Sequence, residues 1–320
     1  MSLFQRLNNI KNRPARVEPG ISLAVMPEGQ EVSSKFGVCV MLETVEPGAL
    51  PFPAPDPAVL HTNLQLVRGI GPVTEGQLRR QGFSCVSDLL VHPKWMEPAG
   101  EVLSLLQGQR VGELQLLGAG TWELLSYFSP EEILFLDIET TGLWASQPLF
   151  LIGFLYYRLG RLHVNQFLAR HYREEKAVLA AAQEVFSHYK VVVSFNGKRF
   201  DVPYISGRSI EHRLFYSYPH HQVDLLFHAK RHFGGVLPNC RLVTLEEHLL
   251  NFRREDDLPG YLIPQTYHRF TQKQDLDLIW PIIEHNRLDL LAMARLFRPV
   301  LQGSFDDDNQ TTFQESVRAR

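Results

Sequence analysis

The chain has 320 residues, about twice the size of a typical domain, so we expect one larger domain and one smaller one. Its hydrophobic content of 44% and charged content of 21% exclude a chain dominated by disorder. With 32 Lys and Arg against 35 Asp and Glu, the formal charge is -3, which excludes an overall basic field. Any site for a polyanion must therefore be local.

The cysteines and the apolar segments set further limits. Cys39, Cys85 and Cys240 lie far apart without a CxxC pair, which argues against a disulfide framework and a zinc ribbon and fits a cytoplasmic protein. No window approaches about 18 uninterrupted apolar residues, and the N-terminal segment lacks the apolar core of a signal peptide. We expect no membrane partner.

The first part of the chain, residues 1–59, is interpreted as an extended, proline-rich N-terminal arm. Leu3, Phe4, Leu7 and Ile10 could form a short amphipathic helix, and FGVCVMLETV at 36–45 could be a strand. PGALPFPAPDP at 47–57 is typical of an extended connector.

Residues 60–127 carry a helical pattern and are predicted to form a small all-α domain. Gly69 and Gly71 bracket a tight turn, Pro72 lies just inside a new helix, and Gly82 follows the end of that helix. A further helix is expected over 84–91, with Ser84 or Ser87 as its cap.

From residue 131 the pattern changes to strands. EEILFLDIE, PLFLIGFLYYRLG and RLHVNQFLA, separated by turns, predict three antiparallel strands. REEKAVLAAAQEVFSHY at 173–189 predicts a helix, and KVVVSFN predicts a short strand parallel to the others. The chain to about residue 300 is expected to be mostly helical, and 301–320 is expected to be a disordered tail.

Three short motifs carry acidic side chains. Asp137 and Glu139 alternate in the first strand, so both point to one face, although a D-x-E triplet alone also fits a solvated strand end. Asp201 lies in the apolar run SFNGKRFDVPYI after the VVV strand, where it needs a partner or caps a helix. His285 and Asp289 share one side of a late helix, where an ordinary surface pair is the alternative.

Together, the strand D-x-E, the later N-x-x-x-F-D and the late H-x-x-x-D resemble the DEDD superfamily of 3'-to-5' exonucleases. The resemblance covers residues 131 to about 298, within a predicted ribonuclease H-like domain of residues 131–300. It implies an α/β fold with a ribonuclease H-like mixed sheet, three antiparallel strands plus parallel strands, flanked by helices. The segments NGKRFDVPYI, HNRLDLLAMARL and LEEHLLNFRREDDLPG look most similar to the YprB-like branch of ribonuclease H-like proteins.

The resemblance implies that Asp137, Glu139, Asp201 and Asp289 hold two divalent cations, which would relieve the repulsion between the paired acids. The reaction implied is two-metal hydrolysis of a phosphodiester, and oxygen ligands favour Mg²⁺ or Mn²⁺. In the superfamily, either a Tyr precedes the final Asp or a His precedes it one residue further away. Here His285 stands at the position that is usually Tyr. As a group expected to titrate near neutrality, His285 is suited to orient or deprotonate the attacking water.

The turn near residue 70 also has a functional interpretation. VRGIGPVTEGQLRRQG resembles a helix-hairpin-helix, whose amides near Gly69 and Gly71 would hold a nucleic-acid phosphate, with Arg68, Arg79 and Arg80 adding positive charge. A turn between packed helices, or a surface that binds a protein partner, is the alternative.

Several other residues are candidates for contacts. Thr140, Gly142 and Asn196 flank the predicted acids and are expected to touch nucleic acid, and Trp144 could stack on a terminal base or pack. His220, Asp224, His228 and His232 recur every fourth residue, so on a helix they could hold a transition metal; surface histidines are the simpler interpretation. Asp224 could instead support the acidic site.

The sequence thus predicts a metal-dependent nuclease, a 3'-5' exonuclease that acts on DNA or RNA. The alternative is a nucleic-acid-binding or scaffold protein on a nuclease fold that has lost activity. The spacing of His285 and the absence of net basic charge favour the alternative, whereas the presence of all four carboxylates favours the enzyme.

Overall fold

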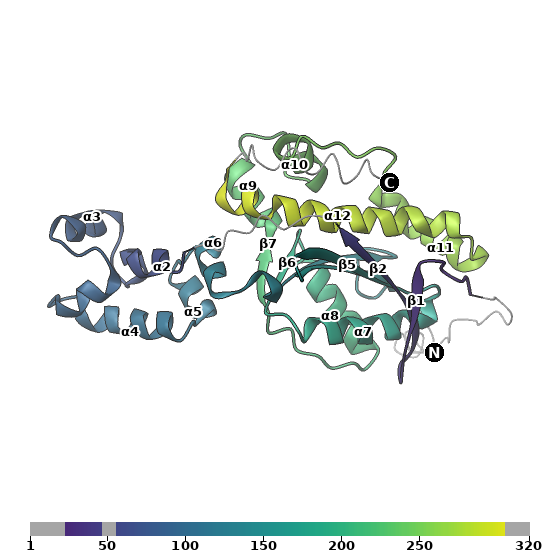
Figure 1. Ribbon diagram of the computed structural model, residues 1–320, viewed down its shortest axis with the longest axis horizontal. Coiled ribbons are helices and arrows are strands. Elements are labelled where there is room, and N and C mark those ends of the chain that lie inside the picture. Colours follow the sequence, from purple (N-terminus) through teal and green to yellow (C-terminus); the bar gives the residue numbers. More distant parts are fainter. Residues whose placement is uncertain (1–22, 47–55, 305–320) are drawn as a thin grey trace, which may run out of the picture.

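The computed structural model describes residues 23–46 and 56–304. Within them, seven strands form one mixed sheet with helices on both faces, and a group of short helices lies beside one edge (Figure 1). The strands are β1 (Gly29–Ser34), β2 (Gly37–Glu46), β3 (Ile133–Thr140), β4 (Leu149–Arg158), β5 (Arg161–Leu168), β6 (Val191–Ser194) and β7 (His221–Asp224). The helices are α2 (Ala58–Thr62), α3 (Pro72–Arg80), α4 (Met96–Gln107), α5 (Val111–Leu116), α6 (Thr121–Leu124), α7 (Glu175–Phe186), α8 (Asp201–Glu211), α9 (Leu225–Phe233), α10 (Leu242–Leu249), α11 (Ile263–Lys273) and α12 (Leu276–Gln302).

The sheet has the strand order β1-β2-β5-β4-β3-β6-β7. Strands β3, β4 and β5 pair antiparallel in a meander, and β6 pairs parallel with β3. A helix, α7, connects β5 to β6, as a parallel crossover requires. The predicted mixed sheet, its three antiparallel strands and its parallel strand are therefore confirmed.

Two strands of this sheet, β1 and β2, come from the predicted N-terminal arm. The strand expected at 36–45 is present as β2, which pairs antiparallel with β5 and forms a hairpin with β1. Cys39, Val40 and Leu42 of β2 are buried, so the strand is fixed by packing as well as by its ladder. The predicted helix over residues 3–10 and the connector residues 47–55 lie outside the described residues.

Helices cover both faces of the sheet (Figure 1). Helix α7, predicted over 173–189, and α8 lie on one face, and the long helix α12 lies on the other with α9, α10 and α11. Because successive strand side chains alternate, Leu134, Leu136 and Ile138 join the core with α7, whereas Ile133 and Phe135 pack in the core beneath α12. Residues 305–320 of the predicted tail lie outside the described residues.

The segment HHQVDLLFHAKRH is not one continuous helix. Residues 221–224 form β7, parallel to β6, and the helix α9 begins only at Leu225. Val223 is buried beside the sheet, and the side chain of Asp224 accepts a hydrogen bond from the amide of Leu226 at 3.1 Å, which caps the helix. The burial of one apolar residue next to β6 therefore overrides the four-residue spacing of the histidines.

The short helices α2 to α6 form a separate cluster with its own core, beside β7 in Figure 1. Helix α3 begins at Pro72 and is followed by Gly82 in a left-handed conformation, as predicted. The helix expected over 84–91 is instead a 3₁₀ helix over Val86–Val91. All three cysteines are free, and no helix in the described ranges combines the length and apolar character needed to cross a bilayer.

Candidate active site

Asp137 and Glu139 lie near the C-terminal end of the central strand β3, on the face covered by α12. Asp137 pairs with Gly153 of β4, and its Oδ2 accepts a hydrogen bond of 2.7 Å from Asn286 Nδ2 of α12. Glu139, two residues further on, is only 9% exposed. The alternation of the strand thus places both carboxylates under the helix, as predicted.

A glycine lets α12 approach these acids closely. A Cβ atom at Gly153 would lie 2.1 Å from Asn286 Oδ1 and 2.8 Å from a methyl carbon of Leu290. The same Asn286 Oδ1 accepts a hydrogen bond of 2.8 Å from Gln166 Nε2 on β5. Asn286 is therefore held from the sheet side, with its Nδ2 directed at Asp137.

Asp201 reaches the site from a tight loop after β6. Asn196 in this loop has a φ of +66°, and its amide donates a 2.9 Å hydrogen bond to Asp224 Oδ1. A Cβ atom at Gly197 would lie 2.5 Å from Ser194 and 2.9 Å from Asp201 Oδ2, so the loop needs glycine there. Asp201 is buried as the first residue of α8.

Asp289 and His285 lie one turn apart on α12, with His285 Nε2 3.8 Å from Asp289 Oδ2. Asp289 Oδ1 is also 2.6 Å from Arg254 Nη2. The Arg254 side chain, 5% exposed, donates to Glu246 at 2.9 Å and to Asp257 Oδ2 at 3.0 Å. One arginine therefore fixes Asp289 and Asp257 relative to each other.

The acids are brought close enough to raise one another's pKa. Burial, and after it repulsion from Asp289, Glu139 and Asp201, raises the pKa of Asp137 well above its ordinary value. Burial raises the pKa of Glu139 to about 8, with the His285 charge acting in the opposite direction and Asp289 and Asp201 adding to the rise. Burial also raises the pKa of Asp201 to about 7.

His285 is shifted away from the neutral range that the sequence suggested. Burial by itself lowers its pKa, but a 2.8 Å hydrogen bond from Nδ1 to Asp257 Oδ1 and the charges of Asp289 and Glu139 raise it to about 9. In this arrangement the ring is an imidazolium whose Nδ1 donates to Asp257, while Nε2 carries a proton 3.8 Å from Asp289. It is thus an orienting group here, and its deprotonating role would need the surrounding negative charge to be reduced.

The donor set suits a hard divalent cation. Asp137, Glu139, Asp201 and Asp289 offer only carboxylate oxygens, and the raised pKa values of the first three show that cationic neighbours do not compensate their charges. In residues 23–46 and 56–304, however, no three His, Cys, Asp or Glu side chains are already arranged to hold a metal. The ion pair between Arg254 and Asp289 would have to loosen for Asp289 to act as a ligand.

The other predicted contact residues have different surroundings. Thr140 Oγ1 donates to the carbonyl of Gly142 at 2.7 Å, which shapes the turn after β3, and Trp144 in that turn is 75% exposed. Trp144 therefore does not pack in the core. His220 precedes β7 and Asp224 ends it, whereas His228 and His232 lie on α9, so the four side chains do not share one side of a helix and the transition-metal alternative has no support.

In the helical cluster, Gly69 has a φ of +91° and Gly71 precedes α3 with open space around its Cβ position. Arg68 and Arg80 are exposed. Arg79 is committed to structure, because its guanidinium pairs with Glu75 at 2.7 Å and donates to the carbonyl of Thr62 at 2.7 Å. Of the three predicted arginines, Arg68 and Arg80 are thus the better placed for a ligand.

Four side chains that complete the site were not predicted from the sequence: Asn286, Gln166, Arg254 and Asp257. Asn286 and Gln166 are buried polar residues on the apolar faces of their elements, since Asn286 is four residues from Ile282 and Leu290, and Gln166 is two residues from Val164 and Leu168; such residues need partners. That pattern could have identified them. Arg254 and Asp257 lie in the charged run RREDD, where nothing in the sequence separates the buried members from the exposed ones.

Comparison with known proteins assigns the fold family. A model of the RNase H superfamily matches residues 134–300, more than half of the 320-residue chain. The chain belongs to the RNase H superfamily. The matched range contains all four carboxylates and His285, and it leaves β1, β2 and the helical cluster outside.

Two individual proteins are similar to this RNase H superfamily chain. The uncharacterized protein YprB of Bacillus subtilis (strain 168) is 32% identical over 176 residues, which are 53% of this chain and 42% of YprB, so the match spans less than half of YprB. A family B DNA polymerase from the hyperthermophilic archaeon Pyrobaculum calidifontis is 18% identical with a TM-score of 0.43, over 54% of this chain and 25% of the polymerase. The second similarity is too low to bear on function.

Proposed function

We propose that this protein is a metal-dependent nuclease, a 3'-5' exonuclease that hydrolyses phosphodiester bonds of DNA or RNA. The observation that carries the proposal is the meeting of Asp137, Glu139, Asp201 and Asp289, from three separate parts of the chain, at one end of β3. Their mutual repulsion persists in the fold, and a divalent cation would relieve it.

The four carboxylates would hold two Mg²⁺ or Mn²⁺ ions. Bound there, the ions would supply positive charge at the scissile phosphate and lower the pKa of a water molecule. Asn286 holds Asp137 through its 2.7 Å hydrogen bond, and Asp257 holds the His285 ring with Nδ1 as donor. His285 Nε2 is then free to orient the attacking water, and compensation of Glu139 and Asp289 by cations would return its pKa toward the ordinary range.

The helical cluster would act as a helix-hairpin-helix that holds nucleic-acid phosphates without reading sequence. The left-handed Gly69, the open Gly71 and the helix that begins at Pro72 support this assignment. Arg68 and Arg80 would add positive charge, and Arg79 would shape the module through Glu75 and Thr62. Binding of a protein partner through this module is the competing role.

The test is digestion of 5'-labelled single-stranded DNA and RNA with Mg²⁺ or Mn²⁺, resolved on a sequencing gel. We expect a ladder that shortens from the 3' end, and a loss of rate on the order of 10³-fold in Asp137→Asn, because one charged ligand is removed. Asp277→Asn, an exposed acid on the same helix as Asp289, is the matched control and should cleave normally. Undiminished cleavage by Asp137→Asn, or by the wild type in chelator, would refute the proposal.

A nucleic-acid-binding protein without catalysis is the second candidate, and the ion pair between Arg254 and Asp289 favours it, because a cation occupies one predicted ligand. Calorimetric titration with Mn²⁺ separates the two. Binding that disappears in Asp201→Asn supports the enzyme, whereas a folded protein that binds no Mn²⁺ supports the scaffold.

A further inference from the structure

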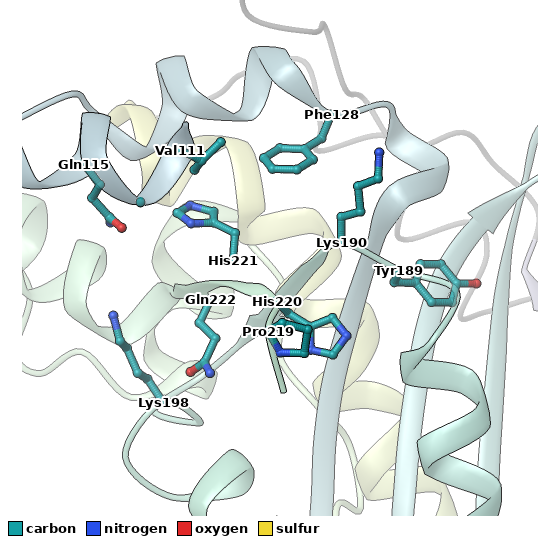
Figure 2. A pocket seen from close by; sticks show the side chains of 11 residues that line it. Val111, Gln115, Phe128, Tyr189, Lys190, Lys198, Pro219, His220, His221 and Gln222 are labelled. Carbon is teal, nitrogen blue, oxygen red and sulfur yellow. The ribbon is translucent and has the colours of Figure 1, made fainter. Parts of the chain in front are cut away.

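A hollow of about 570 Å³ separates the helical cluster from the edge of the RNase H sheet. One wall comes from α5, with Val111, Gly112 and Gln115, and the other from the edge strand β7 and the segments beside it. Figure 2 shows Val111 and Gln115 opposite His221 and Gln222. We call this hollow the α5–β7 groove; neither the RNase H family match nor the acidic site accounts for it.

The α5–β7 groove is locally basic in a chain whose formal charge is -3. Lys190 and Lys198 supply its positive charge, and the lining contains no Asp or Glu. Lys190 Nζ lies 2.5 Å from Glu132, but its side chain is 66% exposed, and such surface pairs exchange readily for another anion. Within the described ranges, Lys198 forms no ion pair. Both ammonium groups are thus available to an anionic ligand.

The two lysines flank one strand, which sets the size of that ligand. Lys190 directly precedes β6 and Lys198 lies four residues after its end; Figure 2 shows their side chains at opposite sides of the groove. A repeating polyanion therefore suits the two lysines better than a single phosphate does. The volume of the groove is in the range of small-molecule sites, which favours a single strand over a duplex.

His221 lines the groove, and its Nε2 has no hydrogen-bond partner among the described residues, although its ring stacks on Phe128 at 6.2 Å between centroids. Leaving such an atom without a partner is costly, but it is covered by protein, so the ring must turn before a ligand in the groove can bind it. Burial, and then the nearby Lys198 charge, lowers the His221 pKa, so the ring is neutral and can donate or accept.

One end of the groove adjoins the loop that leads to the acidic site. Lys198 lies between Asn196 and Asp201 in the sequence, in the loop whose Asn196 amide binds Asp224 at the end of β7. Gln222 of the groove precedes that Asp224 by two residues on the same strand. A nucleic-acid strand that ran from the acids along β7 would therefore pass Lys198 first and then reach α5 of the helical cluster.

We propose that the α5–β7 groove binds the phosphodiester backbone of a single-stranded nucleic acid, next to the segment held at the acidic site. This rests on the proposed function for the identity of the ligand, while the groove itself is defined by its own residues. It would join the helical cluster and the RNase H domain into one binding track.

The test measures binding without catalysis. Fluorescence anisotropy of labelled 12-nucleotide single-stranded DNA and RNA in EDTA compares the wild type with Lys190→Gln/Lys198→Gln. We expect about tenfold weaker binding, and a salt dependence reduced by about 1.4 in slope, because each phosphate contact on a single strand contributes about 0.7. Lys273→Gln is the matched control, since Lys273 ends α11, away from the helical cluster in Figure 1.

A double variant that binds as tightly as the wild type, a wild type that binds neither polymer, or an equal loss in Lys273→Gln would each overturn the proposal. Thermal melting of the double variant checks that its fold is intact. Hydrolysis of a labelled dinucleotide with Mn²⁺ is the second readout: it should survive in the double variant and fail in Asp137→Asn. Lysine-dependent binding without any hydrolysis in the wild type would refute the nuclease and keep the groove.

Discussion

The buried acid at the start of α7 and the buried acids of the candidate active site differ in their partners. Glu175 at the start of α7 is 2% exposed, and both its oxygens are 2.6 Å from the Arg208 guanidinium, with His212 at 2.8 Å and the amide of Leu149 at 2.8 Å. Although burial acts to raise its pKa, these partners lower it overall. For Asp137, Glu139 and Asp201 the pKa is raised instead.

The comparison separates a structural carboxylate from one that needs an external cation. The fold supplies Glu175 with a full set of donors, so its charge is compensated within the chain. Asp137 receives one amide hydrogen bond and faces three further acids. A fold that buries charges without compensating them leaves them available to a ligand of opposite charge.

The largest expected effect is on the compensated acid. Arg208→Ala leaves Glu175 buried without its main partner and should lower the free energy of unfolding by about 3 to 5 kcal/mol. Urea unfolding monitored by circular dichroism measures this. Glu184→Ala is the control on the same helix, because Glu184 is 82% exposed and only 3.6 Å from the exposed His188. That change should cost less than about 0.5 kcal/mol. An equal loss in both variants would remove the distinction drawn from burial.

The next effect is an opposite pH dependence of the two groups. A raised carboxyl pKa means that the folded state binds more protons than the unfolded state, so its contribution to stability falls as pH rises from about 4 to about 8. His285, with its pKa of about 9, contributes stability below about 6.5 that is lost as pH rises through 9. Glu175, with a lowered pKa, contributes stability that is lost only as the solution becomes acidic.

Thermal melting in EDTA between pH 5 and pH 8 should therefore show a melting temperature that declines by several degrees. Asp201→Asn should flatten this decline, because it removes one of the shifted acids. Addition of Mn²⁺ at pH 8 should restore the lost stability through binding to the folded state. A melting temperature that rises steadily over this range would mean that the negative charges of these acids are already balanced within the folded protein.

The sequence predicted much of the RNase H domain because its signals are local. The alternating strands around Asp137, the helix of 173–189 and the i,i+4 pair of His285 and Asp289 each depend on neighbouring residues. The strand at 221–224 was missed, because Val223 gains its stability from a parallel neighbour that the local pattern does not contain. For the same reason, pairing of β2 with β5 could not be foreseen across more than a hundred residues of chain.

The site divides along the same line. Its acids were predicted from their types and order, but the partners that set their protonation are long-range. Arg254 contacts Asp289 across 35 positions, and Asn286 contacts Asp137 across 149. These contacts changed the interpretation of His285, whose expected neutral pKa assumed no fixed carboxylate beside Nδ1.

The smallest expected effect is on that carboxylate. In the described structure, Asp257 binds His285 Nδ1 and Arg254 and none of the four predicted metal ligands. It therefore acts by positioning the ring. Asp257→Asn should reduce the hydrolysis rate by about tenfold and leave KM nearly unchanged, because the ring loses one orienting partner while the carboxylates stay in place. It should also lower the His285 pKa. Burial lowers that pKa, and the Asp257 hydrogen bond is the largest of the interactions that raise it.

Two-dimensional NMR of the imidazole ring follows the His285 pKa in the metal-free protein, and steady-state assays across pH follow the rate. Asp256→Asn is the adjacent control, since Asp256 is exposed and should change neither quantity. If Asp257→Asn slowed the reaction while the His285 pKa stayed near 9, the side chain would be supporting the loop through Arg254 and not the ring. A fall in both the hydrolysis rate and the His285 pKa, by contrast, would show that the rate depends on the orientation of this imidazole. The site would then need His285 as well as its four carboxylates.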